Sequence, residues 1–164
     1  MKQLWAPWRM VYILDELDEK KGCIFCDLPK ENDDKKNLII YRSEYCFVIM
    51  NKYPYNNGHV LIAPYKHTHD YLSLDDQTLL DVQKTAQKVM QVMKNVMQPQ
   101  ALNMGINIGR TAGAGIDQHL HYHIVPRWDG DTNFMPVIAD TKVVSEALAA
   151  TRDKLYEEFK RLYK

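Results

Sequence analysis

The sequence QHLHYHIVP, residues 118–126, decides how this chain is interpreted. It holds three of the six histidines of the chain at alternating positions: His119, His121 and His123. Because successive side chains of a β-strand point to opposite faces, a strand here would place all three imidazoles on one face. Leu120, Tyr122 and Ile124 would then point toward a core. One strand face would thus carry three groups that can bind a metal, move protons or attack phosphorus.

A glycine-rich segment, NIGRTAGAG (residues 107–115), precedes this predicted strand. Glycines let the backbone approach a ligand closely and expose N–H groups that can form an anion-binding nest. The histidines have three interpretations: a three-histidine metal site, a nucleophile with supporting groups, or a polar strand face without chemistry. The glycine-rich turn beside the histidines favours phosphate chemistry over metal-dependent hydrolysis.

The rest of the chain predicts short strands around one long helix. Runs rich in β-branched and aromatic residues predict strands at residues 38–41, 45–50, 59–63, 102–108 and 119–125. Apolar residues at steps of three and four predict a helix over residues 75–98, and Pro99 ends it. The sequence SLDD at residues 73–76 resembles a capping box for that helix. Residues 141–164 predict a C-terminal helix, and residues 1–20 form an arm that contains the aromatic sequence LWAPWR.

This order of elements predicts an α+β fold with a five-stranded antiparallel sheet, one main helix and a C-terminal helix. A length of 164 residues fits a single domain over residues 1–164. The formal net charge is zero, so the chain as a whole does not attract a nucleic-acid backbone and we expect no nucleic-acid partner. We expect no membrane partner and a cytoplasmic location, since neither a bilayer-spanning apolar run nor a signal peptide is present.

The pair Cys23 and Cys26 has three interpretations that the residues alone leave open. A thioredoxin-type redox pair needs a preceding strand, which Lys20-Lys21-Gly22 does not provide. Two unrelated buried cysteines are the simplest alternative. A zinc half-site is the third, and it needs two more ligands. The third cysteine, Cys46, is expected in the core, and three cysteines are too few for a disulfide framework.

The histidine segment resembles the HxHxHxx motif of the histidine triad (HIT) family, with apolar residues between the histidines. The resemblance extends from Cys23 to about Trp128 and includes CIFC at residues 23–26, GHV at residues 58–60 and PYKH at residues 64–67. The arm at residues 4–9 and the segment PRWDGDTNF at residues 126–134 are similar to the branch that contains bacterial diadenosine tetraphosphate phosphorylases.

The resemblance implies a nucleotidyl-histidine mechanism. His121 would attack the α-phosphorus of a nucleotide, and a backbone carbonyl would bind its other ring nitrogen and fix the tautomer. His123 would contact the phosphate oxygens and help protonate the leaving group, and His59 would be a fourth catalytic histidine. The residues implied in nucleotide binding are His123, Asn51 at the ribose, and Asn107, Ala114, Gly115 and Ile116 at the phosphates.

One departure from the family pattern concerns the turn before the triad. Many relatives place Ser, Thr or Gln there, whereas this chain has Gly115 and Ile116, which carry no side-chain donor. Backbone N–H groups would have to replace that donor.

The resemblance also assigns the cysteine pair. In zinc-bearing members, the remaining ligands are the histidine of the PxxH segment and the first triad histidine, here His67 and His119. His69 is a nearby competitor for the third position. Two cysteines and two histidines form a closed tetrahedral set, so this zinc would be structural.

We therefore expect an enzyme that cleaves dinucleoside polyphosphates or nucleoside phosphates at the α-phosphorus, with structural zinc and no organic cofactor. Water as the acceptor would give hydrolysis, and inorganic phosphate would give phosphorolysis, for example of diadenosine tetraphosphate. The alternative is a nucleotide-binding or partner-interaction protein with little turnover. The resemblance further implies a homodimer.

Overall fold

The computed structural model describes residues 22–131 and 145–163. The expectations for the arm at residues 1–20, for residues 132–134 and for the two ends of the 141–164 segment lie outside those ranges. The helices are α2 (Ile24–Asp27), α3 (Asp76–Met97) and α5 (Leu148–Leu162), and the strands are β1 (Ile39–Arg42), β2 (Cys46–Met50), β3 (Val60–Pro64), β4 (Ala101–Ile106) and β5 (Tyr122–Arg127). Short 3₁₀ turns lie at Leu28–Lys30, Tyr71–Ser73 and Arg110–Ala112.

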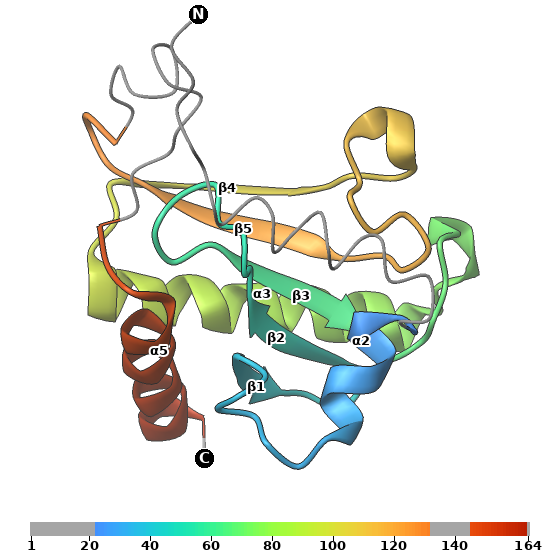
Figure 1. Cartoon of the computed structure of the whole chain (residues 1–164), viewed down its shortest axis with the longest axis horizontal. Helices are drawn as coiled ribbons and strands as arrows, with labels where there is room; N and C mark the ends of the chain where they lie inside the picture. The colour runs from blue at the N-terminus through green and yellow to red at the C-terminus, as the bar shows by residue number, and fades with distance from the viewer. Residues whose placement is uncertain (1–21, 132–144, 164) are drawn as a thin grey trace, which may run out of the picture.

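The strands form one five-stranded sheet in the order β1-β2-β3-β5-β4, with every neighbouring pair antiparallel (Figure 1). The pairing of β5 between β3 and β4 is central to the site, because it sets Leu61 and Gly105 opposite His123. The expected α+β class and antiparallel sheet are confirmed.

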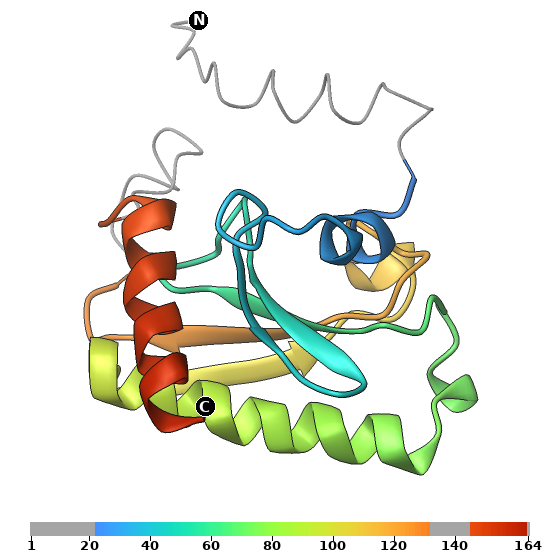
Figure 2. The same ribbon diagram turned by 90° about the horizontal axis from the view of Figure 1, so that it is seen from below.

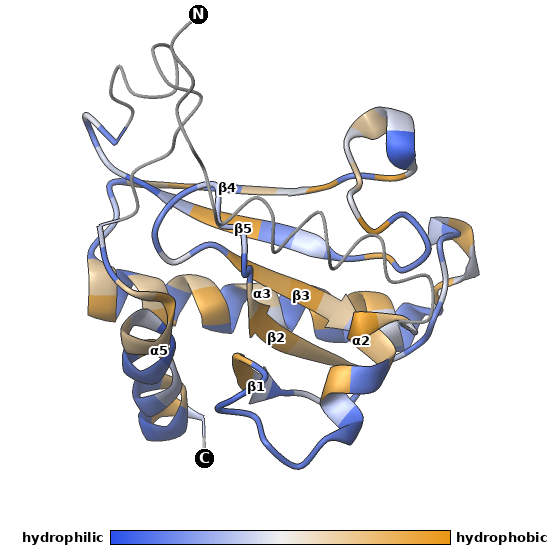
Figure 3. Cartoon of the chain, in the orientation of Figure 1, coloured by the Kyte–Doolittle hydropathy of each residue, from blue (hydrophilic) through white to orange (hydrophobic). Residues whose placement is uncertain are grey.

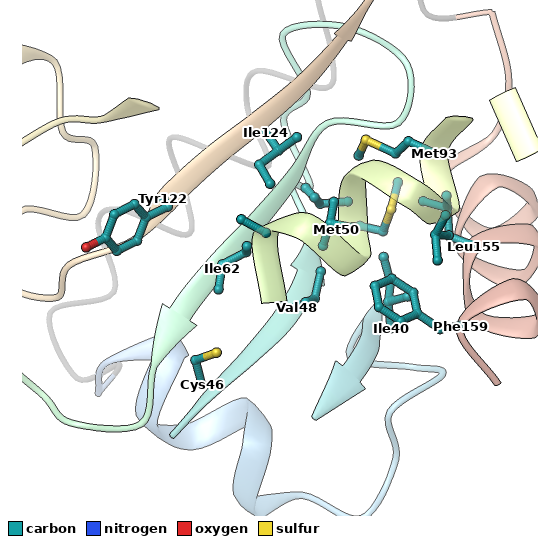
Figure 4. Close-up of a cluster of buried hydrophobic side chains, with 14 of the residues drawn as sticks. Ile40, Cys46, Val48, Met50, Ile62, Met93, Tyr122, Ile124, Leu155 and Phe159 are labelled. Atoms are coloured by element: carbon teal, nitrogen blue, oxygen red, sulfur yellow. The ribbon is translucent and has the colours of Figure 1, made fainter. Parts of the chain in front are cut away.

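Helix α3 covers one face of the sheet and α2 lies on the other, as the turned view shows (Figure 2). The larger core lies between the sheet, α3 and α5, and it includes Val48, Ile62, Ile124 and Phe159 (Figure 4). Figure 3 shows that the apolar residues are dense on β2 and β3, whose side chains are all buried. The expectation that Tyr122 and Ile124 face a core is therefore confirmed.

The predicted bounds of α3 agree with the structure, but its predicted cap does not. The N-cap is Asp75, whose Oδ1 accepts a hydrogen bond from the Thr78 N–H at 2.8 Å. Ser73 instead belongs to the preceding 3₁₀ turn, where its hydroxyl donates to the Asp70 carbonyl. Gln98 ends the helix in the left-handed conformation, directly before Pro99.

The predicted strand at residues 119–125 is wrong at its beginning, because β5 begins at Tyr122. If the β3–β5 register continued toward the N-terminus of β5, Leu120 would lie opposite Pro64. Proline has no backbone N–H to donate to the strand pairing. The Leu120 N–H instead donates to the Thr68 carbonyl at 2.8 Å, and the Pro64 carbonyl binds the His119 ring. His119 and His121 therefore precede the strand, and His123 lies within it. The strand predicted at residues 102–108 likewise ends earlier, at Ile106.

None of the helices in the described ranges combines the length and the hydropathy needed to cross a lipid bilayer.

Candidate functional site

Three imidazoles gather on the face of the sheet opposite α3. His59 directly precedes β3, and His123 lies on the neighbouring strand β5 opposite Leu61. The ring centroid of His123 lies 5.2 Å from that of His59 and 5.0 Å from that of His121. The structure thus brings together all three residues expected to be catalytic, although His59 is distant in sequence from His121 and His123.

His121 has one ring nitrogen committed to the backbone. Its Nδ1 lies 2.9 Å from the carbonyl oxygen of His119. A carbonyl oxygen only accepts, so Nδ1 carries the proton and Nε2 keeps its lone pair. Burial lowers the pKa of His121, against the opposing effect of the His119 carbonyl, and this favours the neutral ring. The expected backbone carbonyl partner is present, and the nitrogen left available has the lone pair that a nucleophile needs.

The tautomers of His59 and His123 follow from a chain of hydrogen bonds. The Tyr55 N–H donates to His59 Nδ1 at 3.0 Å, so a neutral His59 carries its proton on Nε2. That Nε2 lies 3.0 Å from His123 Nδ1 and donates to it. A neutral His123 then carries its own proton on Nε2, a buried atom that has no hydrogen-bond partner among the described residues.

Burial, and secondarily the neighbouring His121, lowers the pKa of His123 to about 4. His123 is therefore neutral near pH 7, and its Nε2–H is a hydrogen-bond donor without a protein partner among the described residues. Buried polar atoms are almost always satisfied in folded proteins, so the unsatisfied donor of His123 marks a candidate ligand position beside His121.

Asn51 lies at the base of the loop that carries His59. Its Nδ2 is 3.2 Å from His59 Nδ1, and its Oδ1 accepts from the Tyr53 N–H at 2.9 Å. The ring of Tyr55 in the same loop packs over His59 with centroids 4.6 Å apart. The predicted ribose-binding residue is thus adjacent to the histidines, within a loop that also sets their tautomers.

The glycine-rich segment folds back on itself beside β5. Gly109 and Gly113 have positive φ angles of 85° and 95°, which side-chain-bearing residues rarely adopt. Asn107 Nδ2 donates to the Gly113 carbonyl at 3.4 Å, so this predicted phosphate contact also shapes the loop. The Ala114 N–H donates to the Gly109 carbonyl at 3.4 Å. Gly115 is exposed and a Cβ there would meet no atom within 4 Å, which leaves its surroundings open.

Two cysteines and two histidines meet at the end of the sheet near Pro64. These are Cys23, Cys26, His67 and His119, and one ligand atom from each lies within 4.8 Å of the others. The Nδ1 of His119 is 3.2 Å from Cys23 Sγ, 3.6 Å from Cys26 Sγ and 3.2 Å from His67 Nδ1. Cys26 Sγ is 3.3 Å from His67 Nδ1. A tetrahedral zinc with sulfur and nitrogen ligands needs edges of about 3.3–3.8 Å, so the arrangement fits that ion.

The His119 ring is oriented for this set by its other nitrogen. Its Nε2 lies 2.8 Å from the Pro64 carbonyl oxygen, which fixes the proton there and leaves the Nδ1 lone pair facing the sulfurs. Such an outer hydrogen bond typically orients a metal-binding histidine. All three cysteines are free thiols. The set contains His67, and His69 is not part of it.

Two residues that contact the histidines were not expected from the sequence. Phe25 packs its ring 5.0 Å from His121, and Tyr55 supplies both the backbone donor and the ring over His59. The position of Phe25 between the two cysteines in the sequence could have indicated that it lies near the site. Nothing in the sequence could have indicated Tyr55, because its contact with His59 is made by a backbone N–H.

A family model described as the HIT domain matches residues 32–130. The AP-4-A phosphorylase of Mycobacterium tuberculosis is 34% identical over 168 residues, which cover 98% of this chain and 86% of that relative. The matched family region begins after the cysteine pair and ends before α5.

Solved structures share the fold. A hypothetical histidine triad nucleotide-binding protein from Sulfolobus tokodaii superposes with a TM-score of 0.68 at 31% identity, covering 85% of this chain and 93% of that chain. A zinc-bound histidine triad family protein from Mycobacterium smegmatis also gives a TM-score of 0.68, at 22% identity, covering 86% and 95% of the two chains. The second likeness shows the fold alone.

Proposed function

This chain belongs to the histidine triad (HIT) family, and on that premise we propose that it cleaves dinucleoside polyphosphates at the α-phosphorus through a nucleotidyl-histidine intermediate. One observation carries the proposal: His121 Nδ1 is held by the His119 carbonyl, so its Nε2 lone pair is available. The ring centroid of His121 lies 5.0 Å from that of His123, whose Nε2–H donor is unsatisfied among the described residues. A nucleophile and a phosphate-oxygen donor therefore share one face.

In the first step His121 Nε2 forms a bond to the α-phosphorus and the bond to the leaving polyphosphate oxygen breaks. The attacking His121 ring becomes cationic, with its Nδ1–H directed at the His119 carbonyl. His123 is neutral, so it donates a hydrogen bond from Nε2 to the phosphate oxygens and keeps its proton. A polyphosphate can depart as an anion, so the reaction does not require His123 as a general acid.

In the second step an acceptor oxygen bonds to the same phosphorus and the N–P bond breaks, which restores His121. We propose inorganic phosphate as this acceptor and diadenosine tetraphosphate as the substrate, giving a nucleoside diphosphate and a nucleoside triphosphate. The 34% identity to a relative called AP-4-A phosphorylase, over nearly the whole chain, supports this choice. Gly115 and Ile116 carry no side-chain donor, so the acceptor would meet backbone there.

We propose that Cys23, Cys26, His67 and His119 hold a structural zinc. The ligand-atom distances and the orientation of His119 support this assignment. Four protein ligands close the coordination shell, so the ion supplies rigidity. Both thiols must be reduced for this, which is the basis on which we propose a cytoplasmic location.

For nucleotide binding we propose Asn51 at the ribose and Asn107 with the backbone of residues 114–116 at the phosphates. Asn51 is half-buried beside His59, so it borders the proposed reaction centre. Gly115 is exposed and its surroundings are open, which leaves room for a phosphate at its backbone.

We propose that the chain forms a homodimer through β4. This strand is an edge of the sheet, and Met104 on it is 37% exposed. An unpaired edge strand presents backbone donors and acceptors that a second copy can pair with.

The direct test incubates the protein with diadenosine tetraphosphate, with and without inorganic phosphate, and identifies the products. The proposal predicts ADP and ATP whose formation requires phosphate. Formation of AMP at the same rate with or without phosphate would replace phosphorolysis by hydrolysis. Tight binding without products would favour the alternative, a nucleotide-binding protein with little turnover.

A further inference from the structure

Phe25 lies between Cys23 and Cys26 in the sequence, and its ring packs against that of His121. The short helix α2 carries it, and the N–H groups of Cys26 and Asp27 both bond to the Cys23 carbonyl at 2.9 Å. Only 1% of the Phe25 surface is exposed. Its ring centroid lies 5.3 Å from that of His119 and 5.0 Å from that of His121.

The His121 ring needs a support of this kind. Its hydrogen bond to the His119 carbonyl fixes one atom, Nδ1, but a single bond leaves the ring plane able to tilt about that atom. Two aromatic rings flank it: Phe25, with an interplanar angle of 33°, and His123, with an angle of 59°. His123 is itself held by His59 and has a proposed contact with substrate. Phe25 is the apolar neighbour that defines the tilt.

We propose that Phe25 is a positioning residue that transmits the rigidity of the Cys23–Cys26 turn to the His121 ring and so holds Nε2 in the direction of attack. The inference rests on the proposed function for its kinetic readout. The proposed role links the cysteine–histidine cluster to the catalytic histidines. The cysteines anchor α2, α2 anchors Phe25, and Phe25 fixes the orientation of the His121 ring. Displacing a reacting group by about 1 Å can cost about 100-fold in rate, so the orientation of this ring matters.

Phe47 provides a matched control in the same apolar cluster. It is fully buried, its ring centroid is 6.5 Å from that of Phe25, and it stacks on Tyr65, with no ring pairing to a histidine among the described residues. A merely structural role for Phe25 predicts that trimming either phenylalanine has the same consequence. A positioning role predicts a loss of kcat for Phe25 alone.

The experiment compares Phe25→Leu, Phe25→Tyr and Phe47→Leu in the full chain, with zinc added. We expect kcat on diadenosine tetraphosphate to fall about 10–100-fold in Phe25→Leu with KM changed less than about threefold. Phe25→Tyr keeps the ring and should retain kcat within about threefold. A cavity of about 370 Å³ borders Phe25, Lys30 and Tyr65. Phe47→Leu should lower the unfolding temperature and leave kcat within about threefold.

A second readout is independent of turnover. The imidazole N–H proton of His121 is followed by NMR, assigned by its absence in His121→Ala. We expect faster exchange with water in Phe25→Leu than in Phe47→Leu, at equal zinc content. Phe25→Met replaces Phe25→Leu if the latter does not fold. The proposal is overturned if Phe25→Leu and Phe47→Leu agree in both kcat and proton exchange. If the wild type fails to cleave the substrate, the proposed function fails, and the proton exchange alone decides the role of Phe25.

Discussion

His119 and His121 lie two residues apart, yet their rings present opposite nitrogens. The Pro64 carbonyl binds Nε2 of His119, so Nδ1 faces Cys23 and Cys26. The His119 carbonyl binds Nδ1 of His121, so Nε2 is the nitrogen left available for the proposed attack. Two backbone oxygens therefore decide which histidine suits a metal and which suits phosphorus. The alternating sequence pattern identifies the histidines. The hydrogen bond from one ring nitrogen to a backbone carbonyl determines which nitrogen each histidine has available.

The largest loss of activity should come from His121→Ala. Removing the proposed nucleophile should lower kcat at least about 10⁴-fold, because no other group can form the intermediate. Zinc content and the Kd for AMP should stay within a few-fold of wild type. Steady-state kinetics and calorimetric titration measure both. Turnover near the wild-type rate would remove the distinction between the two histidines.

The opposite outcome is expected for His119→Ala. This variant should lose bound zinc and on the order of 3 kcal/mol of unfolding free energy, since loss of a metal is among the larger single-site effects. Elemental analysis and chemical denaturation provide the measurements. His69→Ala is the control, because His69 is exposed and lies outside the cluster. Zinc bound equally by both variants would contradict the proposed ligand set.

His123→Ala should have a smaller kinetic effect than His121→Ala. The variant removes the neutral Nε2–H donor, and loss of one such donor typically costs about 10²–10³-fold in kcat. Single-turnover measurements separate the bond-forming step from product release. A loss as large as that of His121→Ala would instead show that His123 takes part in covalent chemistry.

The free energy of unfolding should decrease as the pH falls through the range in which His123 titrates. Its folded pKa of about 4 is below the unfolded value near 6.5, so the unfolded chain binds the proton first as the pH falls. His123 therefore favours the folded state fully above pH 6.5, and this contribution is lost between about pH 6.5 and 4. The fall in unfolding free energy over that range should be shallower in His123→Gln. Parallel curves for the two proteins would contradict the low pKa.

The sequence predicts the fold well where periodicity is strong. The 22-residue helix α3 and the alternation of Tyr122 and Ile124 toward the core are visible in the pattern itself. The beginning of β5 was not predictable in this way, because it depends on the residue that register places opposite Leu120. That residue is Pro64, which cannot donate to a ladder.

The site was predictable in its residue types and less so in its contacts. The spacing of Cys23 and Cys26 allowed a metal half-site among other interpretations, and the family resemblance favoured His67 over His69 as a further ligand. The fold places His67, and not His69, beside the cysteines. The tautomers of His59 and His123 depend on the Tyr55 N–H, a backbone group that every non-proline residue possesses. No side-chain pattern can reveal such a contact.

The central claim, that His121 alone is the nucleophile, has one direct measurement. The protein is mixed with diadenosine tetraphosphate without phosphate, quenched within a turnover, digested and examined by mass spectrometry. Attack by His121 predicts a nucleotidyl group on the peptide that contains residues 119–123, with fragmentation placing it on His121 and no adduct in His121→Ala. A nucleotidyl group on His119 or His123, or rapid turnover in His121→Ala, would contradict it.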